Sequence, residues 1–456
     1  MHALDKELWE LGVPAKTKHN EVAPSQHELA PVFETANVAV DHNQLTMEVM
    51  KKVADRFGYA CLLHEKPFEG INGSGKHNNW SIGTDTGENL LDPGKTPGEN
   101  LQFLVFLMAV IAAVDQYQEV LRISVATAGN DHRLGGNEAP PAIISIFVGD
   151  ELEKVLQSIE DGTSVAGTGK TQMGMGAHVL PHITRDTTDR NRTSPFAFTG
   201  NKFEFRMPGS SLSVANPNIV LNTAVAEILS RIYETLKDVK PEEMNEEVHK
   251  LLRDLLAKHK RILFNGNGYT EEWVQEAHRR GLADLKSLPE AMPHFISDKN
   301  IALFTRHHIY TEEEIRARYE ILLENYAKTI HIEALTLVEM VRKDFTTGLV
   351  RYMKDVTTEA LKKRDLLPES ACSYESEILR TLDETSEQIM LAMRRLEEGT
   401  KKAEGMTDIL EQASFYHDTV LQEMVDLRSW TDRAEAIIPD EYLPYPTYEK
   451  MLFSLR

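Results

Sequence analysis

The sequence predicts an α+β protein in which short strands and helices alternate before residue 220 and helices follow almost without interruption after it. Three observations predict this class. Residues 1–220 are rich in Gly, Pro and Asn, with short apolar runs between loops. From residue 221, apolar residues recur at three- and four-residue spacing, which is typical of helices. A chain of 456 residues is also too long for one ordinary core. We therefore expect two domains, a layered core over 1–220 and a helical region over 221–456.

The first half divides into strands and helices by the length of its apolar segments. Short runs between turn residues predict four strands, over Tyr59–Leu63, Trp80–Ile82, Ala142–Phe147 and Phe203–Arg206. Longer segments predict three helices, over Asp41–Phe57, Glu99–Leu121 and Asp150–Glu160. Because strands interleave with helices, we expect a sheet covered by helices, with the chemistry on the loops.

The second half carries helical periodicity in six segments. They are Ala224–Leu236, Met244–His259, Glu271–Arg280, Glu312–Val341, Glu375–Glu398 and Asp408–Ala434. The last two can pair as an antiparallel hairpin, or each can pack separately as an amphipathic surface helix. His307 and His308 precede a helix start at Thr311, either as a surface pair or as metal ligands.

Composition excludes several classes of protein. The net charge of -21 disfavours nucleic acid and anionic membranes as partners, because both would be repelled. Two cysteines, Cys61 and Cys372, make a disulfide framework improbable and fit a reducing compartment. The first residues lack the apolar core of a secretory signal, and the apolar run Leu101–Val114 is too short to span a bilayer. We expect a cytoplasmic protein.

The stretch KHNEVAPSQHE, residues 18–28, contains a candidate metal site. Glu21 and Glu28 lie seven residues apart, with His19 and His27 beside them. Two carboxylates are suited to a hard cation such as Mg²⁺ or Mn²⁺. The alternative is a solvated loop with ordinary charges.

Two glycine-bearing stretches follow. In NGSGKHNNWS, residues 72–81, Gly73 and Gly75 permit close approach of a ligand to the backbone, and His77 enters a strand. In NDHRLGGNEAPP, residues 130–141, Arg133 offers a guanidinium for a carboxylate or phosphate, and Glu138 lies on the same loop. A glycine turn before a strand is common, so neither stretch is specific by itself.

The stretch DRNRTSPFAFTGNKFEFR, residues 189–206, concentrates cations in an otherwise acidic chain. In its strand, the alternation of side chains puts Glu204 and Arg206 on one face with Lys202. Phe203 and Phe205 take the other face, which can pack on the core. The charged face lines a cavity or lies on an exposed edge strand. With the other three stretches, this inventory indicates metal-assisted phosphoryl transfer to an acid.

The four stretches resemble, in order and wording, those of glutamine synthetases, particularly the long type III branch. NGSGKHNNWS, NEAPPA and FTGNKFEFRMPG carry the resemblance over about the first 220 residues. It implies a catalytic domain with a curved, largely antiparallel sheet and outer helices. It also implies that glutamate and ammonia are joined at the expense of ATP through γ-glutamyl phosphate, with two or more Mg²⁺ or Mn²⁺ ions per site.

The resemblance implies roles for individual residues. Glu21 and Glu28 match ligands of the metal nearer the glutamate site, and His77 and Glu204 match ligands of the second metal. The residues that match glutamate-binding positions are Asn72, Gly73, Arg133 and Arg206. Glu138 matches the glutamate that closes the site and helps to deprotonate ammonium, and Arg192 matches an arginine on the transferred phosphate. Nucleotide-contacting positions correspond to Asn79, Ser81 and Lys202.

One departure from the family concerns the start of the chain. Family members usually begin with a β-rich domain and an E-x-E strand that supplies one ligand to each metal, whereas this chain reaches Glu21 without either. We expect a catalytic and C-terminal portion, which is a fragment, a truncated reading frame or a degenerate relative. The alternative functions are ligation of glutamate to another amine, or an inactive chain that binds nucleotide or assembles with complete subunits. The resemblance also implies a homo-oligomer of stacked rings.

Overall fold

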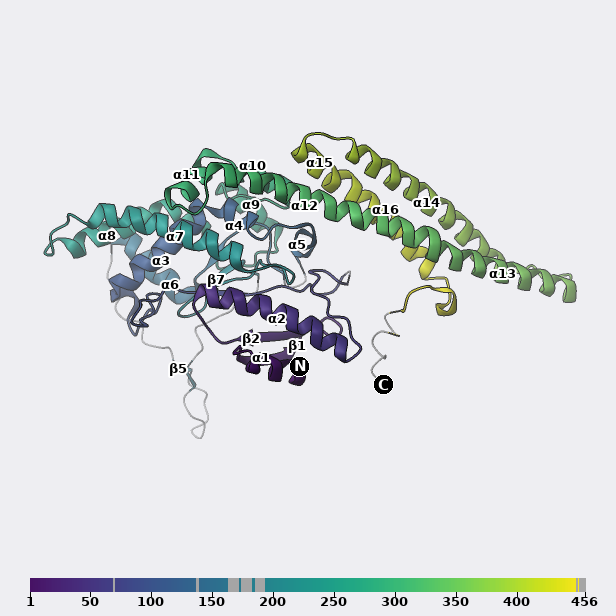
Figure 1. The fold of residues 1–456 in the computed structure, drawn as a ribbon, viewed down its shortest axis with the longest axis horizontal. Coiled ribbons are helices and arrows are strands. Elements are labelled where there is room, and N and C mark those ends of the chain that lie inside the picture. Colours follow the sequence, from purple (N-terminus) through teal and green to yellow (C-terminus); the bar gives the residue numbers. More distant parts are fainter. Residues whose placement is uncertain are drawn as a thin grey trace. The chain divides into compact units, whose positions relative to one another are not determined.

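The computed structural model describes residues 1–68, 70–136, 139–162, 172–173, 183–184, 193–447 and 450. The chain forms two compact units, Met1–Arg316 and Ala317–Arg456, whose elements are labelled in Figure 1. The division expected at residue 220 falls inside the first unit, within helix α7 (Ala215–Leu236). As a boundary between domains it stays a prediction.

The first unit begins with a small α/β layer that the sequence analysis did not predict. Helix α1 (His2–Glu10) is followed by strands β1 (Ala15–Asn20) and β2 (His27–Pro31), and then by helix α2 (Ala36–Arg56). The strands pair antiparallel. Buried apolar residues from α1, α2 and the segment before β1 form one cluster, Leu4, Leu8, Val13, Val49 and Val53. This packing gives the hairpin a fixed support on α1 and α2.

A four-stranded sheet lies at the centre of the first unit, in the order β3-β8-β7-β4. Its strands are β3 (Asn78–Trp80), β8 (Phe203–Phe205), β7 (Phe196–Phe198) and β4 (Ile146–Phe147). Only the pairing of β4 with β7 is parallel. The antiparallel character expected from the sequence is therefore confirmed. Short strands β5 (Gln172–Met173) and β6 (Ile183–Thr184) pair separately.

The interior position of β8 decides between the two readings of the KFEFR segment. Phe203 and Phe205 are fully buried, and Phe203 stacks on Phe196 with ring centroids 4.9 Å apart. Glu204 and Arg206 are also buried. Because β8 has neighbours on both sides, the exposed edge strand is excluded. The predicted strand at Tyr59–Leu63 is wrong, since those residues form no regular element.

Helices surround this sheet in sequence order. They are α3 (Leu101–Gln116), α4 (Gln118–Ile123), α5 (Ala128–Arg133), α6 (Gly149–Asp161), α7, α8 (Met244–His259), α9 (Glu271–Arg279), α10 (Leu288–Phe295) and α11 (Asp298–Arg306), with 3₁₀ turns at Pro97–Glu99 and Lys260–Ile262. The single helix expected over Glu99–Leu121 is interrupted at Tyr117, whose φ of -120° is not helical. Throughout the described ranges, the helices are too short or too polar to cross a membrane.

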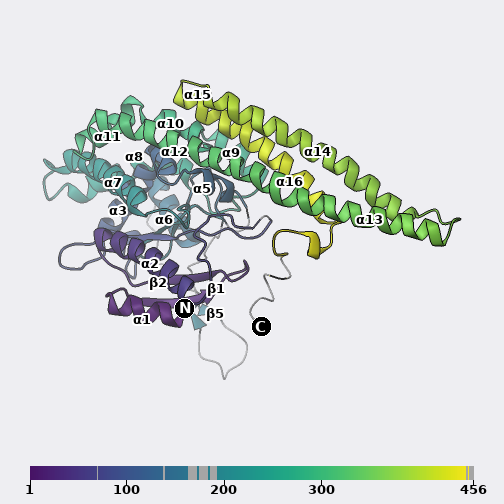
Figure 2. The same ribbon diagram turned by 45° about the vertical axis from the view of Figure 1, so that its right-hand side comes forward.

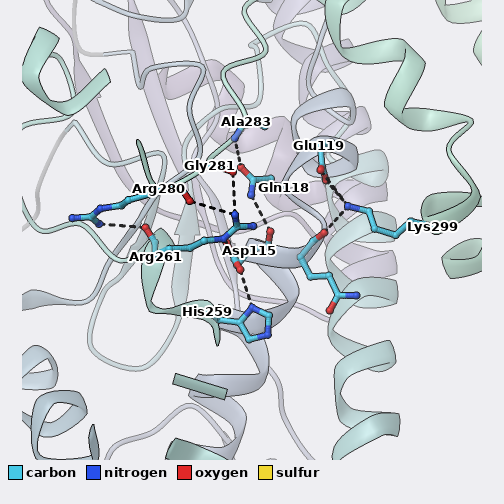
Figure 3. Close-up of polar contacts among 10 residues, drawn as sticks. Asp115, Gln118, Glu119, His259, Arg261, Arg280, Gly281, Ala283 and Lys299 are labelled. Carbon is cyan, nitrogen blue, oxygen red and sulfur yellow. Dashed lines mark hydrogen bonds and ion pairs between the residues drawn. The ribbon is translucent and has the colours of Figure 1, made fainter. Parts of the chain in front are cut away.

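Buried Asp115, near the end of α3, anchors the outer helices (Figure 3). One carboxylate oxygen lies 2.8 Å from Nδ1 of His259, and the other accepts a hydrogen bond of 2.8 Å from Nε of Arg261. Nearby, Oε1 of Gln118 accepts a 2.7 Å bond from the amide of Ala283, and Lys299 pairs with Glu119 at 3.0 Å. A buried carboxylate is tolerated when paired in this way, so the cluster ties α3 and α4 to the segments after α8 and α9.

The second unit is a set of long helices. It comprises most of α12 (Glu312–Glu339), a π-helical turn at Met340–Phe345, α13 (Thr346–Leu366), α14 (Ser373–Glu404), α15 (Ile409–Phe415), a π-helical turn at Tyr416–Val420, α16 (Leu421–Glu435) and a 3₁₀ turn at Asp440–Tyr442. The helix predicted to end at Val341 instead continues into α13 through the first π-helical turn.

The predicted helical hairpin is confirmed within the second unit. Helices α14 and α16 pack against each other, as Figure 2 shows. Arg395 of α14 pairs with Glu423 of α16 at 2.9 Å. The short connection between α14 and α15 requires the chain to reverse direction there, which makes the pair antiparallel.

Candidate functional site

The β1–β2 hairpin brings three metal-ligand side chains together. Its register sets His19 directly opposite Glu28, and Glu21 follows the end of β1. Nε2 of His19 lies 2.7 Å from Oε1 of Glu21 and 2.9 Å from Oε2 of Glu28. One ligand atom from each of the three residues lies within 4.8 Å of the others. His19 is therefore a candidate ligand beside the two carboxylates that the sequence predicted.

The protonation of the two carboxyl groups indicates how closely they approach. Contact with Glu28 lowers the pKa of Glu21, and the neighbouring imidazole of His19 adds to this effect. Burial, together with the contact from Glu21, raises the pKa of Glu28. Two carboxylates this close disfavour simultaneous ionisation unless a cation neutralises them. The donor set of two carboxylate oxygens and one imidazole nitrogen fits Mg²⁺ or Mn²⁺.

A second pair of predicted ligands meets on the four-stranded sheet. His77 immediately precedes β3, and Asn79 of β3 lies opposite Glu204 of β8. Nδ1 of His77 lies 2.9 Å from Oε1 of Glu204, and Oε2 accepts a 2.9 Å hydrogen bond from Nη2 of Arg206. Burial raises the pKa of Glu204, but His77 and Arg206 outweigh it and lower the value to about 2. Glu204 is thus held as a carboxylate.

The two pairs of ligands belong to one site. The charge of His77 lowers the pKa of both Glu21 and Glu28, which requires the imidazole to lie near the hairpin. Nε2 of Gln26, in the hairpin turn, also donates a 3.2 Å hydrogen bond to the carbonyl of Gly73. Residues that are far apart in the sequence are thereby assembled along one side of the first unit.

The predicted glutamate-binding residues lie beside this cluster, although Arg133 differs from expectation. It ends helix α5 and is buried, rather than lying on an open loop. Its Nη1 donates to the carbonyl of Met207 at 3.1 Å, and its Nη2 donates to that of Arg206 at 3.1 Å. Burial lowers the pKa of Arg133 to about 10. The guanidinium therefore supports the strand end after β8, and its predicted contact with glutamate stays a prediction. Asn72 and Gly73 lie directly above this helix end, because a Cβ on Gly73 would come within 2.9 Å of Cγ of Arg133.

The three predicted nucleotide contacts lie around the β3–β8 pair. Ser81 donates a 2.6 Å hydrogen bond to Oδ1 of Asn89, and Asn79 is exposed. Nζ of Lys202 lies 5.7 Å from the ring centroid of Phe33, whose side chain is 63% exposed. These groups remain accessible to a ligand, and their roles stay predictions.

Two further predicted residues, Glu138 and Arg192, lie outside the described residues.

The structure contains one buried carboxylate beside the site that the sequence reasoning missed. Glu65 is 3% exposed and accepts a 2.9 Å hydrogen bond from the amide of Ser211. Its local sequence carries no periodic pattern, and only the tertiary contacts mark it. By contrast, His307 lies 2.8 Å from buried Glu227, so this contact favours a structural role over metal binding.

A cavity in the second unit is separate from these residues. Its volume is about 730 Å³, and it is lined by α12 and by the segment from Thr407 to Tyr416. No predicted site residue lines it. Cavity size therefore does not locate the chemistry of this chain, whereas the cluster of ligands does.

Comparisons with known proteins place the same segments in one family. The family model "Glutamine synthetase, catalytic domain" matches residues 1–140, and "Glutamine synthetase C-terminal domain" matches residues 247–364. The glutamine synthetase of Butyrivibrio fibrisolvens is 63% identical over 461 residues, which cover 100% of this chain and 65% of that protein. The type-3 glutamine synthetase of Dictyostelium discoideum is 44% identical over 455 residues, which cover 98% of this chain and 61% of that protein.

The chain thus spans less than two thirds of the length of these relatives. Among solved structures, "Apo GmaS without ligand" aligns with a TM-score of 0.44 and 17% identity, covering 72% of this chain and 59% of that one. The two family models match sequence on both sides of the sheet, and the identity to the B. fibrisolvens protein extends over the whole chain. On this evidence of sequence, the chain belongs to the glutamine synthetase family.

Proposed function

We propose that the chain carries the ATP-dependent ligation of glutamate and ammonia to glutamine through γ-glutamyl phosphate. The observation that carries the proposal is the convergence of His19, Glu21 and Glu28 with His77 and Glu204. This set of hard and borderline donors suits divalent cations that bind phosphates. Family membership supplies the reaction class.

Two groups of side chains would hold the cations. Glu21 and Glu28, with His19, would bind Mg²⁺ or Mn²⁺ on the hairpin, and His77 with Glu204 would bind a second ion on the sheet. Such ions supply charge neutralisation for the phosphates during transfer. Arg206 keeps Glu204 ionised and oriented, because its guanidinium occupies the carboxylate oxygen that does not face His77.

The remaining predicted residues would bind the organic substrates. Asn72 and Gly73 would contact the amino end of glutamate, with Arg133 and Arg206 near its carboxylates. The adenine nucleotide would lie near Asn79, Ser81 and Lys202, beside the exposed ring of Phe33. Glu138 would close the site and accept a proton from ammonium, and Arg192 would contact the transferred phosphoryl group. Excluding water would protect the acyl phosphate from hydrolysis.

The proposal extends to assembly and location. We propose a homo-oligomer, in line with family membership, and cytoplasmic action. In support of the latter, Cys61 and Cys372 are both free thiols.

The decisive experiment measures γ-glutamyl hydroxamate formation by the full chain with ATP and Mg²⁺ or Mn²⁺. Activity is expected to require ATP and the metal, and to be lost in a double variant, Glu21→Ala with Glu204→Ala. Activity that survives in the double variant would refute the proposed site. A screen of ammonia against organic amines distinguishes glutamine formation from ligation to another amine, since ammonia should react best.

A matched control removes acidic charge elsewhere in the first unit. Glu234→Ala with Glu276→Ala deletes two carboxylates whose printed partners are exposed lysine or arginine side chains. This variant should retain full activity. Calorimetry with Mg²⁺ and ATP tests the remaining alternative, because nucleotide binding without hydroxamate formation would identify an inactive chain.

A further inference from the structure

A buried carboxylate lies beneath the segment that would hold glutamate. Glu65 is 3% exposed, although an unpaired buried carboxylate is strongly disfavoured. Its Oε1 accepts hydrogen bonds from the amide of Ser211 at 2.9 Å and from the hydroxyl of the same residue at 2.5 Å. Its main-chain carbonyl accepts a 2.7 Å bond from the amide of Ser74. One residue therefore contacts both the Asn72–Gly75 segment and the segment after β8.

Three glycines make room for Glu65. A Cβ on Gly209 would lie 2.5 Å from Oε1, and one on Gly129 would lie 2.7 Å from Oε2. A Cβ on Gly73 would lie 2.6 Å from the carbonyl oxygen of Glu65. These contacts are too short for any side chain, so the backbone closes around the carboxylate on several sides. Glu65 has little freedom to move without shifting Gly73.

The surrounding chain reinforces this arrangement. Gly75 pairs with Gly209 in an isolated antiparallel bridge, and the amide of Lys76 donates a 2.8 Å bond to the carbonyl of Pro208. Nζ of Lys76 donates to the carbonyl of Leu212 at 2.6 Å. The Asn72–Gly75 segment is thus held between Glu65 on one side and residues 208–212 on the other.

Cationic groups compensate the buried charge. The negative charge of Glu65 acts on both Arg133 and Lys76, raising their pKa values against the lowering caused by burial. Arg133 lies immediately below the segment, where a Cβ on Gly75 would come within 2.0 Å of its Nη2. The carboxylate and the guanidinium together form a rigid floor for Gly73 and Gly75.

We infer that Glu65 is a positioning residue that sets the place of Asn72 and Gly73 and thereby the affinity for glutamate. The inference rests on the proposed function, since it takes Asn72 and Gly73 to be the contacts for the amino end of glutamate. Glu65 itself does not touch the metal ligands by any contact described above. Its effect should therefore be specific for glutamate rather than for ATP.

The test compares binding of glutamate and of ATP to the full chain, in the presence of Mn²⁺, for the wild type and Glu65→Gln. The amide keeps the shape and one acceptor but removes the charge. We expect the dissociation constant for glutamate to rise about tenfold, as for the loss of a charge-assisted hydrogen bond, and that for ATP to stay the same. Ser211→Ala, which removes only the hydroxyl donor, should produce a smaller shift in the same direction and covers the case in which Glu65→Gln does not fold.

The control is Glu227→Gln, which alters another carboxylate that is 1% exposed. It should lower the melting temperature without changing the affinity for glutamate. Wild-type affinity for glutamate in Glu65→Gln would overturn the inference and leave the proposed function intact. Parallel loss of glutamate and ATP binding would reduce Glu65 to a general structural role and also overturn it. A wild-type chain that binds ATP but no glutamate would refute the proposed function, and the inference with it.

Discussion

Nδ1 of His77 lies 2.9 Å from Oε1 of Glu204, and the two residues reach this distance from different strands of the central sheet. The second oxygen of the carboxylate is held by Arg206. Glu204 is therefore buried, ionised and oriented by two cationic or basic neighbours. This arrangement preforms one half of the proposed metal site.

Removing the charge of Glu204 should weaken metal binding. In Glu204→Gln, the neutral amide is a poor ligand for a divalent cation, and we expect Mn²⁺ affinity to fall at least about tenfold, which is the lower range for disturbing even an outer-shell partner. Titration calorimetry with Mn²⁺ measures the change. Glu276→Gln, which alters an exposed carboxylate paired with Arg279 and Arg280, should bind Mn²⁺ as the wild type does. Equal affinities in the two variants would contradict the assignment.

His19 and His27 provide a matched pair for testing the hairpin. His19 contacts Glu21 and Glu28, whereas His27 lies 2.7 Å from Oδ1 of Asn20, and His27 and Glu28 point to opposite faces of β2. His19→Ala should therefore lower Mn²⁺ affinity, and His27→Ala should not. The same calorimetric titration compares them. An effect of His27→Ala as large as that of His19→Ala would show that the hairpin responds to any loss of a histidine.

The glycine at position 75 should resist enlargement. A methyl group there would lie 2.0 Å from Nη2 of Arg133, so the floor beneath the Asn72–Gly75 segment would have to move. We expect Gly75→Ala to lower the free energy of unfolding by about 1–3 kcal/mol, as is typical of overpacking. Thermal and denaturant unfolding provide the measurement.

Gly136→Ala is the control for this substitution, because a Cβ at that position meets no atom within 4 Å. Its unfolding should match that of the wild type. If both alanine variants unfold alike, the close packing of Gly75 on Arg133 does not stabilise the unit.

The buried carboxylate of Glu227 should make stability depend on pH. Burial raises its pKa, but the hydrogen bonds from His307 and Arg231 and the charges of Arg231 and Arg306 outweigh burial, so the pKa is lowered from 4.5. A depressed pKa contributes stability that is present above the unfolded value and is lost as the pH falls below it. The wild type should therefore melt at a higher temperature than Glu227→Gln at pH 7, with a smaller difference below about pH 4.5.

Calorimetric melting at several pH values tests this dependence. Glu234→Gln, on the same helix α7 and paired only with Lys237 among its printed ion pairs, should melt like the wild type at both ends of the range. A difference between the wild type and Glu227→Gln that does not change with pH would mean that the carboxylate acts through shape rather than charge.

Local patterns predicted much of the fold correctly. The bounds of α8 match the prediction, because an amphipathic segment between turn residues carries its own period. The alternation in KFEFR correctly placed Phe203 and Phe205 on the core. Such features depend on residues near in sequence. For the same reason the prediction was wrong at Val341, where a π-helical turn carries the helix onward, and at Tyr59–Leu63, where apolar composition produced no strand.

The sequence by itself determined the kinds of side chain at the site and the family to which the chain belongs, because both are properties of short ordered motifs. Only the tertiary structure decided which of these side chains meet. The register of the hairpin joined His19 to Glu28, and the pairing of β3 with β8 joined His77 to Glu204. Packing also buried Arg133 and revealed Glu65 beneath Gly73, since burial and contact depend on segments distant in the chain, which no local periodicity encodes.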